Sequence, residues 1–122
     1  MRALLIYILY YLSKLPFLGD LFKTLLAASA VGDGSVAMNE KSYDRAFKIL
    51  KRFEYDDIDY VWIATCQQML GNMYLNGMGV SKDESRAVAI FQRAASAGND
   101  EAITFMRQWN AKQRSLHSNQ GS

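Results

Sequence analysis

The run CQQMLGNMYLNGMGVSKDESRAVAIFQRAASAGNDEA, from Cys66 to Ala102, decides the fold of this 122-residue chain. Leu70, Met73 and Tyr74 recur at i, i+3 and i+4, which places them on one face of a helix. The same spacing returns in a second apolar stripe, made of Ala87, Ile90, Phe91, Ala94 and Ala95. The stretch therefore predicts two antiparallel helices whose apolar faces pack against each other.

Glycines and a cap mark the ends of these helices. Gly77 and Gly79 favour a turn with positive φ, and Gly98 stands where a helix-ending glycine belongs. Ser81 and Glu84 have the spacing of a capping box, so Ser81 is expected to cap the second helix. A helix pair of this size cannot bury both of its faces alone, so it needs neighbouring helices.

The stretch resembles the Sel-1-like repeat, a relative of the tetratricopeptide repeat. The matching positions are Leu70, Gly71, Met73, Tyr74, Gly77, Gly79, Val80, Asp83, Ala87, Phe91, Ala94, Ala95, Gly98 and Ala102. The resemblance implies an all-α fold of antiparallel helix pairs, stacked as a short right-handed solenoid that binds other proteins. Gly71 would let the two helices approach closely in such a pair.

The repeat continues imperfectly on both sides. Ala102 has the register of Cys66, 36 residues earlier, a period typical of helical solenoids. No second glycine turn follows, so residues 100–114 are expected to cap the stack and residues 115–122 to form a disordered polar tail. Upstream, residues 42–53 resemble the second helix of an eroded repeat. The expected helices are 3–13, 17–30, 34–41, 42–53, 58–76, 82–97 and 100–114.

Composition agrees with one small helical domain, residues 31–114, behind an apolar segment, residues 1–30. Half of the chain is apolar, the only proline is Pro16, and the net charge is +2. So small a charge argues against a nucleic-acid partner. No cofactor-binding or metal-ligand pattern occurs, and the lone His117 lies in the polar tail. We therefore expect a protein that is not an enzyme, with no catalytic, cofactor or metal residues.

Residues 1–30 leave three interpretations open. Their first apolar run, Ala3 to Leu12, has about half the length that a membrane-spanning helix requires. A secretory signal would use Arg2 as its basic region and the small residues 28–30 as its cleavage pattern, giving a product that begins near Val31.

The other two interpretations keep the segment in the mature chain. A helical hairpin that binds a membrane surface or a partner would be broken at Pro16 and anchored at the interface by Tyr7, Tyr10 and Tyr11. Alternatively, these helices cover the end of the repeat stack and complete its core. The first two interpretations predict a periplasmic or inner-membrane-associated protein, and the third a cytoplasmic one.

A partner-binding surface is predicted where the chain departs from the repeat pattern. The acidic loop, residues 54–59, combines negative charge with aromatic side chains, and the terminal helix adds a basic and aromatic pair. The predicted contact residues are Glu54, Tyr55, Asp56, Asp57, Asp59, Tyr60, Trp62, Arg107 and Trp109.

Two functions follow from the resemblance. The first is an adaptor or scaffold that binds a component of an envelope assembly. The alternative is an immunity protein that neutralises a cognate secreted antibacterial effector, such as a type VI secretion lipase, because small bacterial proteins with this repeat include such inhibitors.

Overall fold

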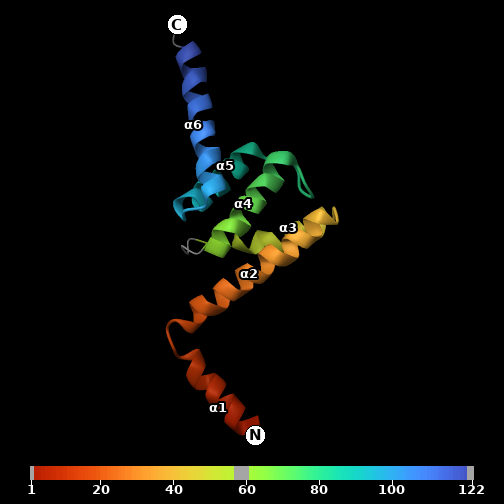
Figure 1. Ribbon diagram of the computed structural model, residues 1–122, viewed down its shortest axis with the longest axis vertical. Helices are drawn as coiled ribbons and strands as arrows, with labels where there is room; N and C mark the ends of the chain where they lie inside the picture. Colours follow the sequence, from red (N-terminus) through yellow and green to blue (C-terminus); the bar gives the residue numbers. More distant parts are fainter. Residues whose placement is uncertain (1, 57–60, 121–122) are drawn as a thin grey trace.

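The computed structural model describes residues 2–56 and 61–120, and within them the chain is helical with no strands. The helices α2 to α5 form the body of the molecule, while α1 and α6 extend from it in opposite directions, so that the termini lie at opposite ends of the long axis (Figure 1). The elements are α1 (Arg2–Ser13), α2 (Leu18–Asn39), α3 (Tyr43–Leu50), the 3-10 helix η1 (Lys51–Phe53), α4 (Val61–Asn76), α5 (Glu84–Ser96) and α6 (Asp100–Gln120). The predicted all-α fold of packed helix pairs is confirmed.

The hairpin of α4 and α5 is the centre of the fold. Leu70, Met73, Phe91 and Ala94 are all buried at its interface. A Cβ at Gly71 would lie 3.0 Å from the ring of Phe91, so a larger residue here would force that ring to shift. The predicted close approach at Gly71 is therefore confirmed, and the side chain that uses the space is Phe91.

The turn between α4 and α5 is built on positive φ, as the glycines predict. Gly77 and Gly79 have φ of 67° and 69°. The cap differs from the prediction, because α5 begins at Glu84 and the side chain of Asp83 accepts a hydrogen bond from the backbone N–H of Arg86 at 3.1 Å. The backbone N–H of Asp83 also donates to the Tyr74 carbonyl, which holds the turn two residues beyond the expected cap.

The upstream region differs most from the sequence prediction. Two separate helices, 17–30 and 34–41, are expected there, but α2 runs unbroken from Leu18 to Asn39. The helix continues through Gly34. A Cβ at this position would lie 3.2 Å from the Leu50 side chain, so the glycine allows α3 to pack closely against α2. The glycine is there for packing rather than for a turn, and the expected domain boundary at residues 30 and 31 falls inside one helix.

Small residues along α2 bring it close to the rest of the body. Ala27, Ala30 and Ala37 are buried, and α2 packs against both α3 and α4. The second half of α2 therefore supplies the helix that pairs with α3, and the two hairpins stack on each other.

The terminal helix α6 is also longer than expected. It packs on α5 through a stacked pair of rings, Phe91 and Phe105, whose centroids are 4.0 Å apart. Residues 115–120 continue the helix instead of forming a disordered tail. Residues 100–120 contain neither glycine nor proline, so nothing in the sequence breaks the helix before Gly121.

Helix α1 makes little contact with the body and has no buried residue. The axes of α1 and α2 are bent by 96° at the turn that contains Pro16. Within the described residues, no single helix is long and apolar enough to cross a membrane, although α1 and α2 together satisfy that test as a bent pair.

Candidate interaction surface

The first part of the acidic loop is held to the body through its own backbone carbonyls. The side-chain amide of Gln67, on α4, donates to the carbonyl of Phe53 at 2.9 Å and to the carbonyl of Asp56 at 2.8 Å. Gln67 is buried, so these two bonds satisfy an amide that would otherwise be costly to bury. One helix thus fixes both ends of the segment from residue 53 to residue 56.

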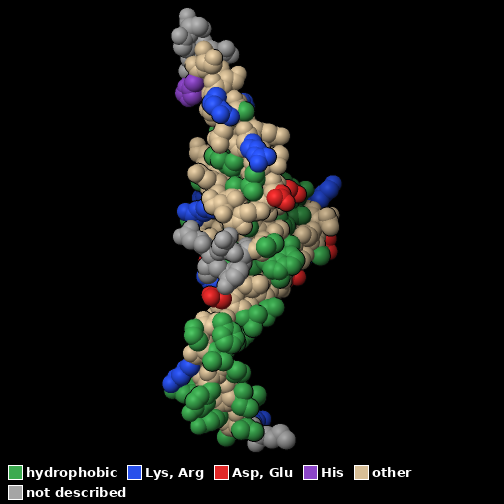
Figure 2. Space-filling view, turned by 60° about the vertical axis from the view of Figure 1, so that its left-hand side comes forward, with side chains coloured by type: hydrophobic (Ala, Val, Ile, Leu, Met, Phe, Trp, Pro, Cys, Tyr) green, Lys and Arg blue, Asp and Glu red, His purple; other side chains and the backbone are tan. Residues whose placement is uncertain are grey.

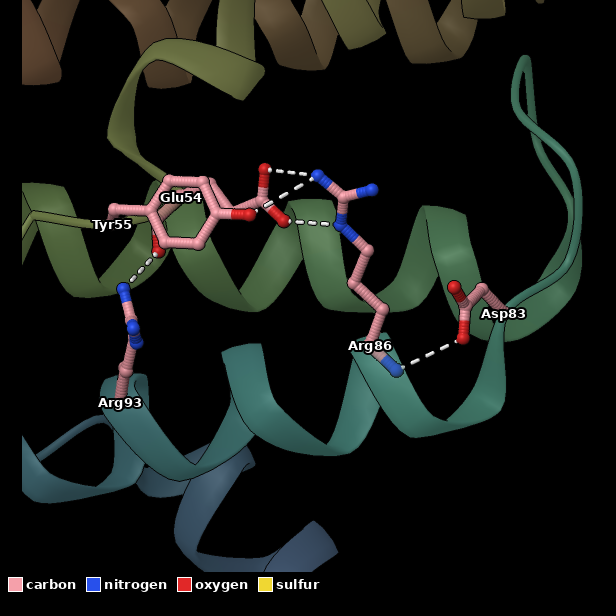
Figure 3. Close-up of polar contacts among 5 residues, drawn as sticks. All are labelled: Glu54, Tyr55, Asp83, Arg86 and Arg93. Atoms are coloured by element: carbon pink, nitrogen blue, oxygen red, sulfur yellow. Dashed lines mark hydrogen bonds and ion pairs between the residues drawn. The ribbon is translucent and has the colours of Figure 1, made fainter.

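Glu54 is the best-anchored residue of this segment. Its side chain is only 2% exposed and accepts two hydrogen bonds from the guanidinium of Arg86, from Nε at 2.5 Å and from Nη2 at 3.0 Å. Its backbone carbonyl accepts a third, from Nη1 of Arg93 at 3.1 Å (Figure 3). Both arginines come from α5, seven residues apart, so they reach the loop from one face of that helix.

The environment of Arg86 keeps it charged. Its hydrogen bonds to Glu54 raise the pKa of the guanidinium above its usual value, although burial opposes this shift. The guanidinium also lies 4.8 Å from the centre of the Tyr74 ring. Burial, with the nearby Glu54 charge, raises the pKa of the Tyr74 hydroxyl. The cluster is therefore a two-point ion pair resting on an aromatic ring, which suits a structural role.

A second ion pair ties the loop to α2. Lys23 Nζ lies 2.8 Å from Asp56 Oδ1, and the Asp56 side chain is largely buried. Together with the pair at Glu54, this contact neutralises both acidic residues of the loop that the structure describes. Glu54 is one of the predicted contact residues, and the structure places its carboxylate inside the protein, bound to Arg86.

Aromatic side chains are what this region presents to solvent. Tyr55 is 67% exposed, with its ring 5.0 Å from the Arg93 guanidinium, and Trp62 is 43% exposed on the first turn of α4. Beside Tyr55 lies a shallow cavity of about 310 Å³, whose lining residues are Glu54, Tyr55, Arg86, Ala89, Ile90 and Arg93. An anchored loop with exposed aromatics is a suitable surface for binding a protein.

The two predicted residues on the terminal helix lie elsewhere. Arg107 is exposed on a basic face of α6 that also carries Arg114 and His117. Trp109 is half-buried, because its ring stacks on Phe105 with centroids 6.2 Å apart. Among the described residues, no hydrogen bond or ion pair joins this helix to the acidic loop.

Three predicted contact residues, Asp57, Asp59 and Tyr60, lie outside the described residues. Of the others, Tyr55 and Trp62 are exposed, and Asp56 is paired with Lys23. Arg86 and Arg93 were missed by the sequence analysis. Their seven-residue spacing on one helical face, beside an acidic segment, is the signal that could have identified them.

The chemistry of the body is unsuited to nucleophilic catalysis at its only cysteine. Cys66 is fully buried, and burial raises the pKa of its thiol to about 12, so the reactive thiolate is scarce at neutral pH. Within residues 2–56 and 61–120, no group of three or more His, Cys, Asp or Glu side chains could hold a metal ion.

Residues 64–99 match the Sel1 repeat family. The matched stretch contains most of α4, the glycine turn and all of α5, so the repeat coincides with the central hairpin. The resemblance inferred from the sequence is therefore confirmed for this stretch. No curated protein and no solved structure matches the chain.

Proposed function

We propose that this Sel1-repeat protein is a non-enzymatic adaptor that acts at the cell envelope and binds a partner protein through Tyr55 and Trp62. Sel1 repeats generally mediate protein–protein interaction, so binding to another protein follows from the repeat itself. The observation that carries the proposed surface is the anchored segment from residue 53 to residue 56, which exposes an aromatic side chain on a fixed backbone.

The energetics of recognition favour such an arrangement. Aromatic side chains contribute most to the affinity of many interfaces, and a surface fixed in advance loses little conformational entropy on binding. Because Glu54 and Asp56 are paired internally, their charges add little to the surface potential. The proposal therefore assigns the affinity to Tyr55 and Trp62, and the envelope location to the apolar segment, residues 1–30.

A pull-down from the native host tests the protein-binding proposal. The tagged chain is cross-linked, recovered and compared with Tyr55→Ala and Trp62→Ala by quantitative mass spectrometry. Loss of the same co-purifying protein in both variants, but not in Val36→Ala, supports the proposal, since Val36 is an exposed residue on α2. Tyr55→Phe should retain the partner, because the ring remains. If both aromatic variants recover the same proteins as the wild-type chain, Tyr55 and Trp62 do not form the binding surface.

The alternative function is an inhibitor of a secreted effector. It rests on the resemblance and on the small size of the chain, which offers a surface for one dedicated partner. If the recovered partner is an enzyme, adding the purified chain in increasing amounts distinguishes the two functions. A one-to-one loss of the partner's activity supports the inhibitor, whereas unchanged activity supports the adaptor.

A further inference from the structure

Helix α1 is apolar and exposed along its entire length. Hydrophobic side chains cover α1 and the first turns of α2 on the face shown in Figure 2, with a few basic side chains among them. The exposed fractions of the large hydrophobic side chains on α1 range from 40% at Leu12 to 67% at Ile6. The total accessible surface of the chain is 8329 Å², against about 6,600 Å² for a compact monomer of this mass. The N-terminal helices contribute to this excess.

The two faces of α1 differ in chemistry. Leu5, Ile8, Leu9 and Leu12 follow i, i+3, i+4 and i+7, so they form one aliphatic face. The opposite face carries Tyr7, Tyr10, Tyr11 and Lys14 at the same spacing. The Tyr7 and Tyr11 hydroxyls lie 3.2 Å apart, and Lys14 Nζ lies 4.4 Å from the Tyr10 ring centre, as expected for neighbours on one face.

This division suits the surface of a lipid bilayer. Tyrosine prefers the headgroup level, where its ring is in an apolar layer and its hydroxyl meets polar groups, whereas leucine and isoleucine prefer the acyl chains. A second copy of the chain is a poorer occupant. One partner helix would cover the aliphatic face and leave the tyrosine rings in water, whereas a bilayer accommodates both faces.

The charge of this region indicates the kind of bilayer. The first nineteen residues carry two cations, Arg2 and Lys14, at the two ends of α1, and no acidic residue. Lys23, further along, is already paired with Asp56. The two unpaired positions therefore favour anionic headgroups, to which basic residues are attracted.

The apolar surface continues onto the start of α2. Leu21, Phe22, Leu25 and Leu26 are all about half exposed or more, and they share one face. The opposite face turns towards the body, where Lys23 pairs with Asp56 and Ala27 is buried. The beginning of α2 can thus contact lipid while its later turns remain packed against α3 and α4.

We propose that α1 lies in the plane of an anionic bilayer, with Leu5, Leu9 and Leu12 in the acyl layer and the tyrosine face at the headgroups. The start of α2 enters the same layer, and the repeat stays outside it. This inference extends the proposed function by naming the lipid surface that would hold the repeat at an envelope membrane.

Vesicle binding tests the choice of lipid. The 122-residue chain is sedimented with vesicles of phosphatidylcholine alone or of phosphatidylcholine and phosphatidylglycerol at three to one. We expect tighter binding to the anionic vesicles by about fivefold for each engaged cation. The double variant Arg2→Gln, Lys14→Gln should lose this preference, and Lys112→Gln, Arg114→Gln should keep it, because those cations lie on α6. If the wild-type chain and both double variants show the same preference for anionic vesicles, Arg2 and Lys14 do not determine the choice of lipid.

Spin labels test the orientation of α1. Single cysteines replace Leu5, Tyr7, Tyr11 or Leu12, and accessibility to oxygen and to a water-soluble nickel complex reports depth. Cys66 stays unlabelled because it is fully buried. A helix in the plane places labels 5 and 12 at one greater depth and labels 7 and 11 at one shallower depth.

Two other results would overturn the orientation. In a helix that crosses the membrane, depth follows position along the helix: labels 5 and 7 would have one similar depth and labels 11 and 12 another, whichever face they occupy. Self-association of the chain without vesicle binding, seen by analytical ultracentrifugation, would assign the surface to a second copy. None of these positions is buried, so the fold is expected to survive the substitutions, and circular dichroism checks it. The vesicles contain no protein, so failure here leaves the protein-binding proposal untouched, and loss of the partner in the pull-down leaves this one untouched.

Discussion

Replacing Gly79 by alanine should separate the two stacked hairpins. Gly79 has φ of 69°, and a Cβ placed there would lie 2.6 Å from the carbonyl carbon of Tyr43 and 2.7 Å from its oxygen. Tyr43 is the first residue of α3, so the turn of the central hairpin presses directly on the start of the preceding one. A backbone atom cannot swing aside as a side chain can, so the whole turn or the start of α3 must move.

The magnitude can be worked out from two contributions. A left-handed conformation costs a non-glycine residue roughly 1–2 kcal/mol. Forcing an additional methyl group into a well-packed contact typically costs roughly 1–3 kcal/mol more. Gly79→Ala should therefore lower the free energy of unfolding by about 2–5 kcal/mol in total, and the melting temperature should fall by about 4 °C for each kcal/mol.

Gly98 supplies a matched control for the second contribution. It also has positive φ, 88°, but a Cβ there would meet nothing within 4 Å. Gly98→Ala should thus show only the conformational cost, roughly 1–2 kcal/mol. Urea denaturation followed by circular dichroism measures both variants. Equal losses of stability in the two would refute the contact between Gly79 and α3, and with it the docking of the hairpins at this point.

Three further predictions concern the body of the protein. Gly71→Leu should lower the free energy of unfolding by roughly 1–3 kcal/mol, because the Phe91 ring occupies the space, and an unchanged urea midpoint would contradict that contact. Arg86→Met should lower the free energy of unfolding by roughly 2 kcal/mol or more, because it leaves the buried Glu54 carboxylate without its partner. Arg93→Met removes one hydrogen bond to a backbone carbonyl and should lower it by about 1 kcal/mol. If urea denaturation shows the larger loss in Arg93→Met, the ion pair between Arg86 and Glu54 is contradicted. Burial raises the pKa of the Cys66 thiol from 9.0 to about 12. The stabilising contribution of the thiol is therefore complete below pH 9 and is lost as the pH rises from 9 to 12, by about 1.4 kcal/mol per pH unit. The fall in stability over that range should be shallower in Cys66→Ala, and parallel pH profiles would show that the thiol is not desolvated.

The central hairpin could be predicted because its sequence signals are local. The glycines that require positive φ, the apolar spacing and the small residue at the helix contact all lie within one stretch of the chain, and each favours the same structure. Helix α2 could not be predicted in the same way. The sequence predicts a break at residues 31–33, but the helix continues, and the Leu50 side chain from α3 packs against Gly34. Packing between helices overrides the local preference of glycine.

The candidate surface shows the same limit. The sequence places Glu54 and Asp56 in an acidic segment, which suggests an exposed negative patch. Their partners, Arg86 and Lys23, are 32 and 33 residues away along the chain, so the neutralisation depends on how the helices stack. The aromatic residues Tyr55 and Trp62 are exposed, so they remain predicted contact residues.

This pairing determines how substitutions in the loop must be interpreted. Glu54→Ala would free Arg86 and loosen the segment that presents Tyr55, so a loss of partner binding in this variant would arise from displacement of the aromatic ring. Tyr55→Ala leaves the ion pair between Glu54 and Arg86 in place. It removes an exposed side chain, together with the hydrogen bond that Arg86 Nη2 donates to the Tyr55 hydroxyl at 3.4 Å and the contact of the ring with Arg93. Binding lost in Tyr55→Ala with stability unchanged therefore identifies a direct contact, whereas binding lost only together with stability in Glu54→Ala identifies a residue that supports the surface from within.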